Sequence, residues 1–252
     1  MQATNWNRKA LLGSFDKPLP PFFPLAVLAT DLALLGAGLA VVLLATGVAL
    51  KLVGTCIVTA GIVRLFMVGH DACHGSFSGN KKLNAVCGRI AFLPSMTAFS
   101  LWQVGHNTAH HGFNNLKGRD QVWAPLSKVE FDALPRYRQL LERLYRSGFG
   151  WGAYYLIEMW WKKLYFASHK EIGSSRRKYK LDSLLVSAGA LLWLSAVAFA
   201  ARETDQSFVL LYTLAVVVPF LLWNAVIGFV VYLQHTSPSI AWFLNRHEWQ
   251  RN

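Results

Sequence analysis

The sequence is poor in charge for its length. Only 15% of its 252 residues are Asp, Glu, Lys or Arg, and 54% are hydrophobic, whereas soluble domains usually carry about 25% charged residues. Acidic residues are scarcest, with 13 against 25 Lys and Arg, so the net charge is +12. So little charge excludes the surface of an ordinary soluble domain. So many hydrophobic residues exclude intrinsic disorder, which requires few apolar and many charged residues.

Cysteine is rare as well. The chain has three, Cys56, Cys73 and Cys87, and two of them lie in or beside apolar runs. Because the number is odd and the chain is long for a disulfide scaffold, a disulfide-rich secreted protein is excluded, and we expect the thiols to be reduced.

Long apolar runs are what the sequence has in abundance. They extend over residues 24–50, 52–69, 183–201 and 208–233. Each is long enough for a membrane-spanning helix, which needs about 20 residues to cross a ~30 Å hydrocarbon core. We therefore predict an all-α integral membrane protein, a single domain over residues 1–252, with four transmembrane helices arranged as two hairpins. Residues 70–182 lie between the hairpins.

Basic residues are concentrated in this middle segment. Residues 70–182 contain seventeen Lys and Arg and eight Asp and Glu, a net charge of +9. By the positive-inside rule the segment is cytoplasmic, and we expect a multi-pass protein of a bacterial inner or plasma membrane. No nucleic-acid-binding motif is present. The charge is better explained by an anionic lipid surface or an acidic protein partner.

Histidine supplies the most distinctive pattern. Five of the eight histidines fall in two clusters, HDACH with His70 and His74, and HNTAHH with His106, His110 and His111. Positions i and i+4 share a helix face, so His70 and His74 are expected to point at one centre, and His106 and His110 likewise. Neutral imidazole is a good ligand for iron, zinc, copper or nickel. The two clusters therefore predict a metal site.

A sixth candidate ligand, His235, follows the last apolar run. Six imidazoles exceed the four ligands of one tetrahedral zinc ion, which favours two metal ions, and oxygen chemistry at a membrane surface suggests iron. Cys73 should point away from a face shared by His70 and His74. A non-enzymatic membrane protein that stores or transports metal through these histidines is an open alternative.

Two shorter apolar stretches lie within the cytoplasmic segment. Residues 83–102 are interrupted by Arg89 and Pro94, and residues 149–166 hold eight aromatic side chains. We predict interfacial helices here, lying along the membrane surface rather than crossing it. A crossing by residues 83–102 would put the two histidine clusters on opposite sides. Within the spans, Asp31 and Arg64 lie at similar depth, and we predict an ion pair between them. The open alternative is that Arg64 extends to the interface.

The histidine motifs resemble those of the integral-membrane fatty acid desaturases. The pattern HxxxH, then HxxxHH about thirty residues later, between two pairs of spans, is similar to that of the acyl-lipid, Δ12/ω-3-like branch, as are YLQHT at residues 232–236 and the later Glu248-Trp249. The resemblance implies a di-iron enzyme that uses O₂ to introduce a cis double bond into the acyl chain of a fatty acid or membrane lipid. The iron ligands that it implies are His70, His74, His106, His110, His111 and His235.

Further roles follow from the resemblance. The reaction needs an electron donor such as ferredoxin or a cytochrome b5-like protein, for which the expected surface is Arg176, Arg177, Lys178 and Lys180. Asp71, Asn107 and Asn114 are expected to orient the ligands. Another membrane di-iron oxygenase, a carotenoid ketolase or hydroxylase or an alkane hydroxylase, is the nearest alternative.

The sequence departs from the family pattern after the last span. The family has a third box, HxxHH, which does not occur up to Asn252. We therefore expect the C-terminal part to be missing, with an HxxHH further along the gene, and the chain as written not to hold a competent di-iron centre.

Overall fold

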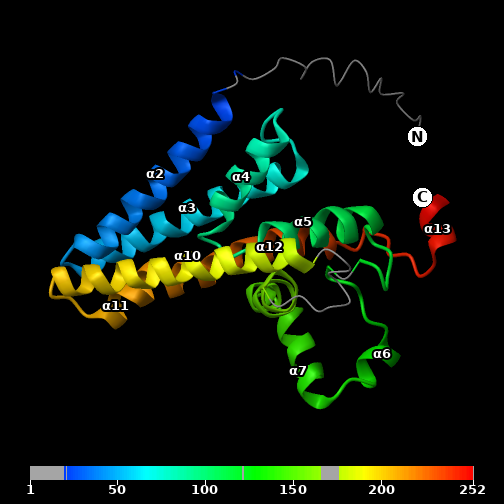
Figure 1. Cartoon of the computed structure of the whole chain (residues 1–252). Coiled ribbons are helices and arrows are strands. Elements are labelled where there is room, and N and C mark those ends of the chain that lie inside the picture. The colour runs from blue at the N-terminus through cyan, green and yellow to red at the C-terminus, as the bar shows by residue number, and fades with distance from the viewer. Residues whose placement is uncertain (1–19, 21, 121, 166–175, 252) are drawn as a thin grey trace, which may run out of the picture.

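A computed structural model describes residues 20, 22–120, 122–165 and 176–251, which contain many helices and no β-strand beyond isolated bridges. Four helical stretches are long and apolar enough to cross a membrane. They are α2 (Phe23–Leu44), α3 (Val48–His74), α10 (Arg176–Glu203), and a composite of α11 (Phe208–Tyr212), the π-helix η4 (Thr213–Val217) and α12 (Val218–His235). The predicted all-α fold with four spanning helices is confirmed. Figure 1 shows α2 and α3 running side by side, and α3 also packs along α12.

The turn of the first hairpin lies earlier than the sequence suggested. The predicted spans meet at Lys51, but α2 ends at Leu44 and α3 begins at Val48. Lys51 is buried in α3, and its Nζ donates to the Val42 carbonyl at 2.6 Å. That carbonyl belongs to the last turn of α2, where helices leave acceptors unpaired. Lys51 therefore lies within the second helix of the hairpin, where it donates a hydrogen bond to the first helix, and it is not part of the turn.

The predicted ion pair between the first two helices is present. Arg64 Nε lies 2.6 Å from Asp31 Oδ1. The Asp31 side chain is only 2% exposed, whereas that of Arg64 is 55% exposed. The carboxylate is thus held inside the hairpin by a guanidinium at its edge.

The segment between the first hairpin and the second histidine cluster does not cross the bundle. Gly75, with φ of 75°, ends α3, and the chain returns in α4 (Lys81–Phe92) and α5 (Phe99–Gln103). Twelve residues of α4 cover only ~18 Å, too little for a membrane core. Arg89 pairs with Asp182 of α10 through two hydrogen bonds of 2.7 and 3.2 Å. The same carboxylate accepts from the Ser100 backbone at 2.9 Å, which ties the start of α5 to α10.

The aromatic stretch packs more deeply than expected. It forms α8 (Trp151–Tyr154) and the π-helix η3 (Tyr155–Tyr165), both against α12. Tyr155 and Trp160 are buried, and Trp160 Nε1 donates to the Met96 carbonyl at 2.9 Å. One side of this stretch therefore belongs to the protein core.

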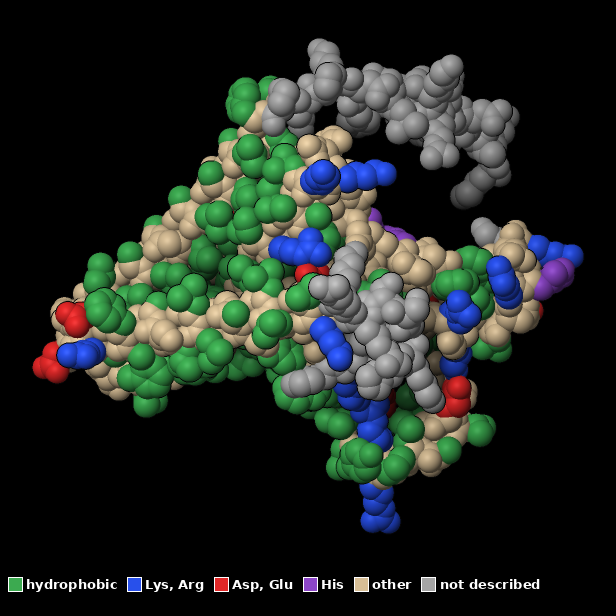
Figure 2. All heavy atoms as spheres, viewed as in Figure 1, with side chains coloured by type: hydrophobic (Ala, Val, Ile, Leu, Met, Phe, Trp, Pro, Cys, Tyr) green, Lys and Arg blue, Asp and Glu red, His purple; other side chains and the backbone are tan. Residues whose placement is uncertain are grey.

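The remaining helices surround the ends of the long ones. They are the π-helix η1 (Val104–His110), the 3₁₀-helix η2 (His111–Phe113), α6 (Lys128–Asp132), α7 (Arg136–Tyr145) and α13 (Arg246–Arg251). In Figure 1, α6 and α7 project from the bundle as an arm. Figure 2 shows hydrophobic side chains over the long helices, with most visible Lys and Arg toward the end that carries the histidines.

Candidate metal centre

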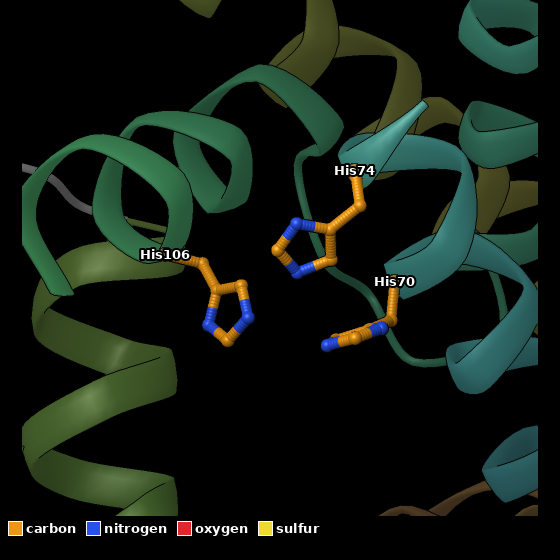
Figure 3. Close-up of side chains that lie close together, drawn as sticks. All are labelled: His70, His74 and His106. Atoms are coloured by element: carbon orange, nitrogen blue, oxygen red, sulfur yellow. The ribbon is translucent and has the colours of Figure 1, made fainter. Parts of the chain in front are cut away.

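The first histidine cluster gathers at the end of α3. His70 and His74 lie one helical turn apart, and their ring centroids are 4.6 Å apart. His106 comes from η1, with its ring 5.0 Å from His70 and 5.1 Å from His74. Figure 3 shows the three rings pointing toward one another. Each offers a ligand nitrogen within 4.8 Å of the others, so the three could bind one metal ion.

The second histidine box is divided between two groups. Residues 104–110 form a π-helix, in which the His111 backbone N–H bonds to the His106 carbonyl, five residues back. Five-residue spacing therefore aligns the side chains of His106 and His111, whose Nε2 atoms are 3.0 Å apart. The ring of His111 is also 5.1 Å from that of His74. The predicted pairing of His106 with His110 on one α-helical face is thus wrong in detail, and His111 takes that place.

His110 belongs to a second group with Asp120 and His235. The rings of His110 and His235 are 4.9 Å apart, and His110 Nδ1 lies 3.0 Å from Asp120 Oδ2. Ligand atoms of the three residues all lie within 4.8 Å of one another. The ring of His110 is only 5.6 Å from that of His106. Two candidate metal-binding groups therefore stand side by side, as two ions require.

Asp120 is the site residue that sequence reasoning missed. Its side chain is fully buried and accepts from the backbone N–H groups of Asn115 at 2.9 Å and Val122 at 3.0 Å. A signal was available, because Asp120 is the only acidic residue between Asp71 and Glu130. A lone carboxylate nine residues beyond a histidine box could have been chosen as a partner for the box.

The residues predicted to orient the ligands have different contacts. Asp71 Oδ1 lies 3.0 Å from His70 Nδ1, as expected for an orienting group. Asn107 donates to the Cys73 carbonyl at 2.9 Å, and the Asn114 backbone carbonyl accepts from Trp249 Nε1 at 2.9 Å. Within the described part of the chain, neither asparagine side chain bonds to a histidine. Cys73 is buried and directed at the Phe99 carbonyl, away from the histidines as predicted.

The surroundings of His106 and His111 favour their neutral forms. Burial, together with the neighbouring imidazoles, lowers the pKa of His106 to about 2, and the same causes lower the pKa of His111. Burial alone would raise the pKa of Asp120, but the hydrogen bonds from His110 and two backbone N–H groups lower it below its ordinary value. Neutral imidazole and ionised carboxylate are the forms that bind metals.

A largely apolar cavity of about 300 Å³ opens beside both groups. His70, His106, His110 and His235 reach its wall, and the rest is mainly hydrophobic. Lining residues include Phe66, Trp102, Tyr155, Met159, Ile227 and Val231. Trp102 also stacks on His106, with ring centroids 4.0 Å apart. An apolar molecule in this cavity would have the imidazoles within reach.

Of the predicted electron-donor surface, the side chain of one residue is described. Lys180 is exposed, and the side chains of Arg176, Arg177 and Lys178 lie outside the described residues.

Comparisons with known proteins agree with these motifs. The family model for fatty acid desaturases matches residues 47–252. Over 187 residues the chain is 31% identical to an "sn-1 oleoyl-lipid 12-desaturase" of Arthrospira platensis, covering 73% of this chain and 49% of that protein. Over 181 residues it is 29% identical to an "sn-1 acyl-lipid omega-3 desaturase (ferredoxin)" of a Synechocystis species, covering 71% of this chain and 48% of that protein.

A shorter match, 37% identical over 84 residues, is to the "Omega-3 fatty acid desaturase fat-1" of Caenorhabditis elegans, and it covers 33% of this chain and 21% of that protein. The chain spans about half the length of the first two relatives. Since the family model matches most of the chain, including every histidine of both groups, this protein belongs to the fatty acid desaturase family.

Proposed function

We propose that this chain carries the active-site part of an O₂-dependent desaturase, which introduces a cis double bond into the acyl chain of a fatty acid or membrane lipid. The observation that carries the proposal is the placement of two histidine groups against one apolar cavity at the end of four spanning helices. A saturated acyl chain suits such a cavity. The overall reaction removes two hydrogens from adjacent carbons, and with two further electrons and two protons O₂ becomes two waters.

The residues fit two iron ions. His70, His74, His106 and His111 would hold one, and His110 and His235 would contribute to the other. His235 Nδ1 is buried and has no hydrogen-bond partner among the described residues, which suits a ligand nitrogen. Iron bound here would supply the oxidising power that a methylene without an acidic proton requires.

Asp120 fits best as the residue that orients His110. Its two oxygens are engaged by backbone N–H groups and by His110 Nδ1, which leaves His110 Nε2 to face a metal. Carboxylates that bind the second nitrogen of a ligand histidine fix its tautomer and ring orientation.

The walls of the cavity determine how a chain lies. Phe66, Tyr155 and Ile227 exclude water from the space beside the histidines. Trp102 holds the ring of His106 by stacking on it. The position of the double bond would then depend on how far an acyl chain extends past His106 and His110.

Electrons are proposed to arrive from an acidic carrier on the cytoplasmic side. The net charge of +9 over residues 70–182 favours that orientation and that class of partner. A related cyanobacterial enzyme is named for ferredoxin, which supports a ferredoxin-like donor over other carriers. Because exposed charges are screened at physiological salt, donor-dependent turnover should fall as ionic strength rises.

Product analysis tests the proposal. The product of the whole gene is expressed in a membrane of known lipid composition, and lipids made with and without O₂ are compared by mass spectrometry. A loss of two hydrogens per acyl chain is expected, whereas a gain of one oxygen would favour a hydroxylase or ketolase. His106→Gln should abolish the product and lower the iron content, and His247→Gln, an exposed histidine in α13, serves as the matched control. Wild-type iron content in His106→Gln would contradict the assignment.

A further inference from the structure

The arm formed by α6 and α7 presents an apolar surface that the proposed chemistry does not use. Tyr137, Leu140 and Leu144 lie three and four residues apart on α7, so they share one face of the helix. Their exposed fractions are 65%, 66% and 49%. Arg136 and Arg143 are exposed at the margins of the same face.

The inner side of α7 carries ion pairs beside its apolar contacts. Arg138 binds Glu158 of η3 at 2.7 Å and contacts Glu142 at 3.4 Å. Tyr145, fully buried, donates to the same Glu158 carboxylate at 3.1 Å. A helix on a water-exposed surface places its apolar side inward and its polar side outward. The apolar outer face of α7 departs from this arrangement, which indicates that this face does not meet water.

The apolar face continues onto the surface of a spanning helix. Phe149, 90% exposed, follows α7 and lies 6.1 Å from the ring of Trp151. Trp151 in turn lies 5.0 Å from the ring of Phe229, which is exposed on α12. In Figure 1, α7 runs crosswise to α10 and leaves the bundle beside the end of α10 nearest the histidines. The arm is therefore placed at the depth where the lipid around α12 meets water.

We propose that α7 is an in-plane membrane anchor, whose outer face inserts into the leaflet on the side of the histidine groups. Tyr137, Leu140, Leu144 and Phe149 enter the boundary between acyl chains and headgroups, and Arg136 and Arg143 bind lipid phosphates. Amphipathic segments with aromatic and basic residues bind membranes in this way, more strongly where the lipid is anionic. The inner ion pairs hold the arm rigidly to η3, so the anchor fixes the height of that helix relative to the membrane.

Fluorescence quenching in vesicles tests the anchor. Leu140→Cys and Phe149→Cys are each made in a Cys56→Ser background, because Cys56 is the exposed native thiol, and are labelled with the fluorophore NBD. The full chain is reconstituted in phosphatidylcholine vesicles with or without phosphatidylglycerol. Lys128→Cys is the control, since its side chain is 85% exposed and pairs with a neighbouring exposed carboxylate. Each labelled protein must keep the unfolding midpoint of its unlabelled parent.

The expected result separates lipid from water. Labels at 140 and 149 should be quenched by spin-labelled lipids and be several-fold less accessible to aqueous iodide than the label at 128. Phosphatidylglycerol should strengthen the lipid quenching, and Arg136→Gln with Arg143→Gln should remove that increase. Iodide access at 140 and 149 equal to that at 128 overturns the proposal. Protection from both quenchers that disappears on dilution with excess lipid also overturns it, in favour of contact with a second copy. Neither readout depends on iron or on desaturation.

Discussion

Replacing Asp120 by Asn tests the buried carboxylate at the centre of the second histidine group. Oδ2 accepts from the Asn115 backbone and Oδ1 from the Val122 backbone, while His110 Nδ1 lies within 3.1 Å of both oxygens. Asparagine has the same shape but only one accepting oxygen. Whichever way the amide is turned, one of the two backbone N–H groups then faces an NH₂ group.

Two separate losses follow from this geometry. An unsatisfied buried donor costs about 1–3 kcal/mol, so the metal-free protein should lose stability by that amount. Loss of a group that orients a metal-binding histidine typically lowers metal affinity by about 10–100-fold. Asp132→Asn is the matched control, because Asp132 is exposed and pairs with exposed Lys128. Exposed ion pairs of that kind contribute about 0–1 kcal/mol.

The two effects are measured independently. Thermal unfolding in detergent with a chelator gives the stability of the metal-free protein, and chelator competition gives the iron affinity. An unchanged iron affinity in Asp120→Asn would show that the carboxylate does not orient His110. An unchanged unfolding midpoint would refute the hydrogen-bond argument, whatever the metal does.

Three further changes test the packing around the site. Asp31→Asn and Arg64→Gln should each destabilise the first hairpin, and the double variant should be no less stable than either single variant. Additive losses of unfolding free energy in this double-mutant cycle would exclude coupling between the two residues. Gly228→Ala places a methyl group 2.4 Å from a backbone oxygen of α8 and should cost about 1–3 kcal/mol of unfolding free energy, with Gly148→Ala, which has open space, as the neutral control. Burial alone would raise the pKa of Glu158, but its basic partners lower it from 4.5. The ionised Glu158 carboxylate therefore stabilises the folded state fully above pH 4.5, and this contribution is lost as the pH falls through the lowered pKa of Glu158. Glu158→Gln should remove this pH dependence of the unfolding midpoint.

The spanning helices were predictable because the hydropathy of a segment depends only on the residues within that segment. Four runs of apolar residues are sufficient to predict four spanning helices, and all four are present. The position of the first turn was not predictable in that way. In the sequence, Lys51 indicates a polar break between two apolar runs, but its ammonium group is buried against a helix-terminal carbonyl. That contact depends on how two helices meet. The Arg89–Asp182 pair likewise joins residues 93 positions apart, which no local pattern indicates.

The site was predictable where the helix is regular. His70 and His74 lie in an α-helix, and their i, i+4 spacing brings both rings toward one centre. The Asp31–Arg64 pair was also predictable, because two charges at equal depth in neighbouring spans have few other partners. Asp120 was not, because its position depends on the turn after η2 and on two backbone N–H groups that follow from that turn.

The helix geometry of η1 explains why one histidine box can serve two metal-binding groups. In an α-helix, His106 and His110 would face the same way and His111 would be turned aside. Hydrogen bonding from His111 to the carbonyl five residues back instead aligns His106 with His111, and His110 faces Asp120 and His235. Short π-helical segments are uncommon and occur frequently at functional sites. Here the extra residue in the turn directs adjacent histidines toward different groups, so one short segment contributes to both. The two groups lie close together, with the ring centroids of His106 and His110 5.6 Å apart.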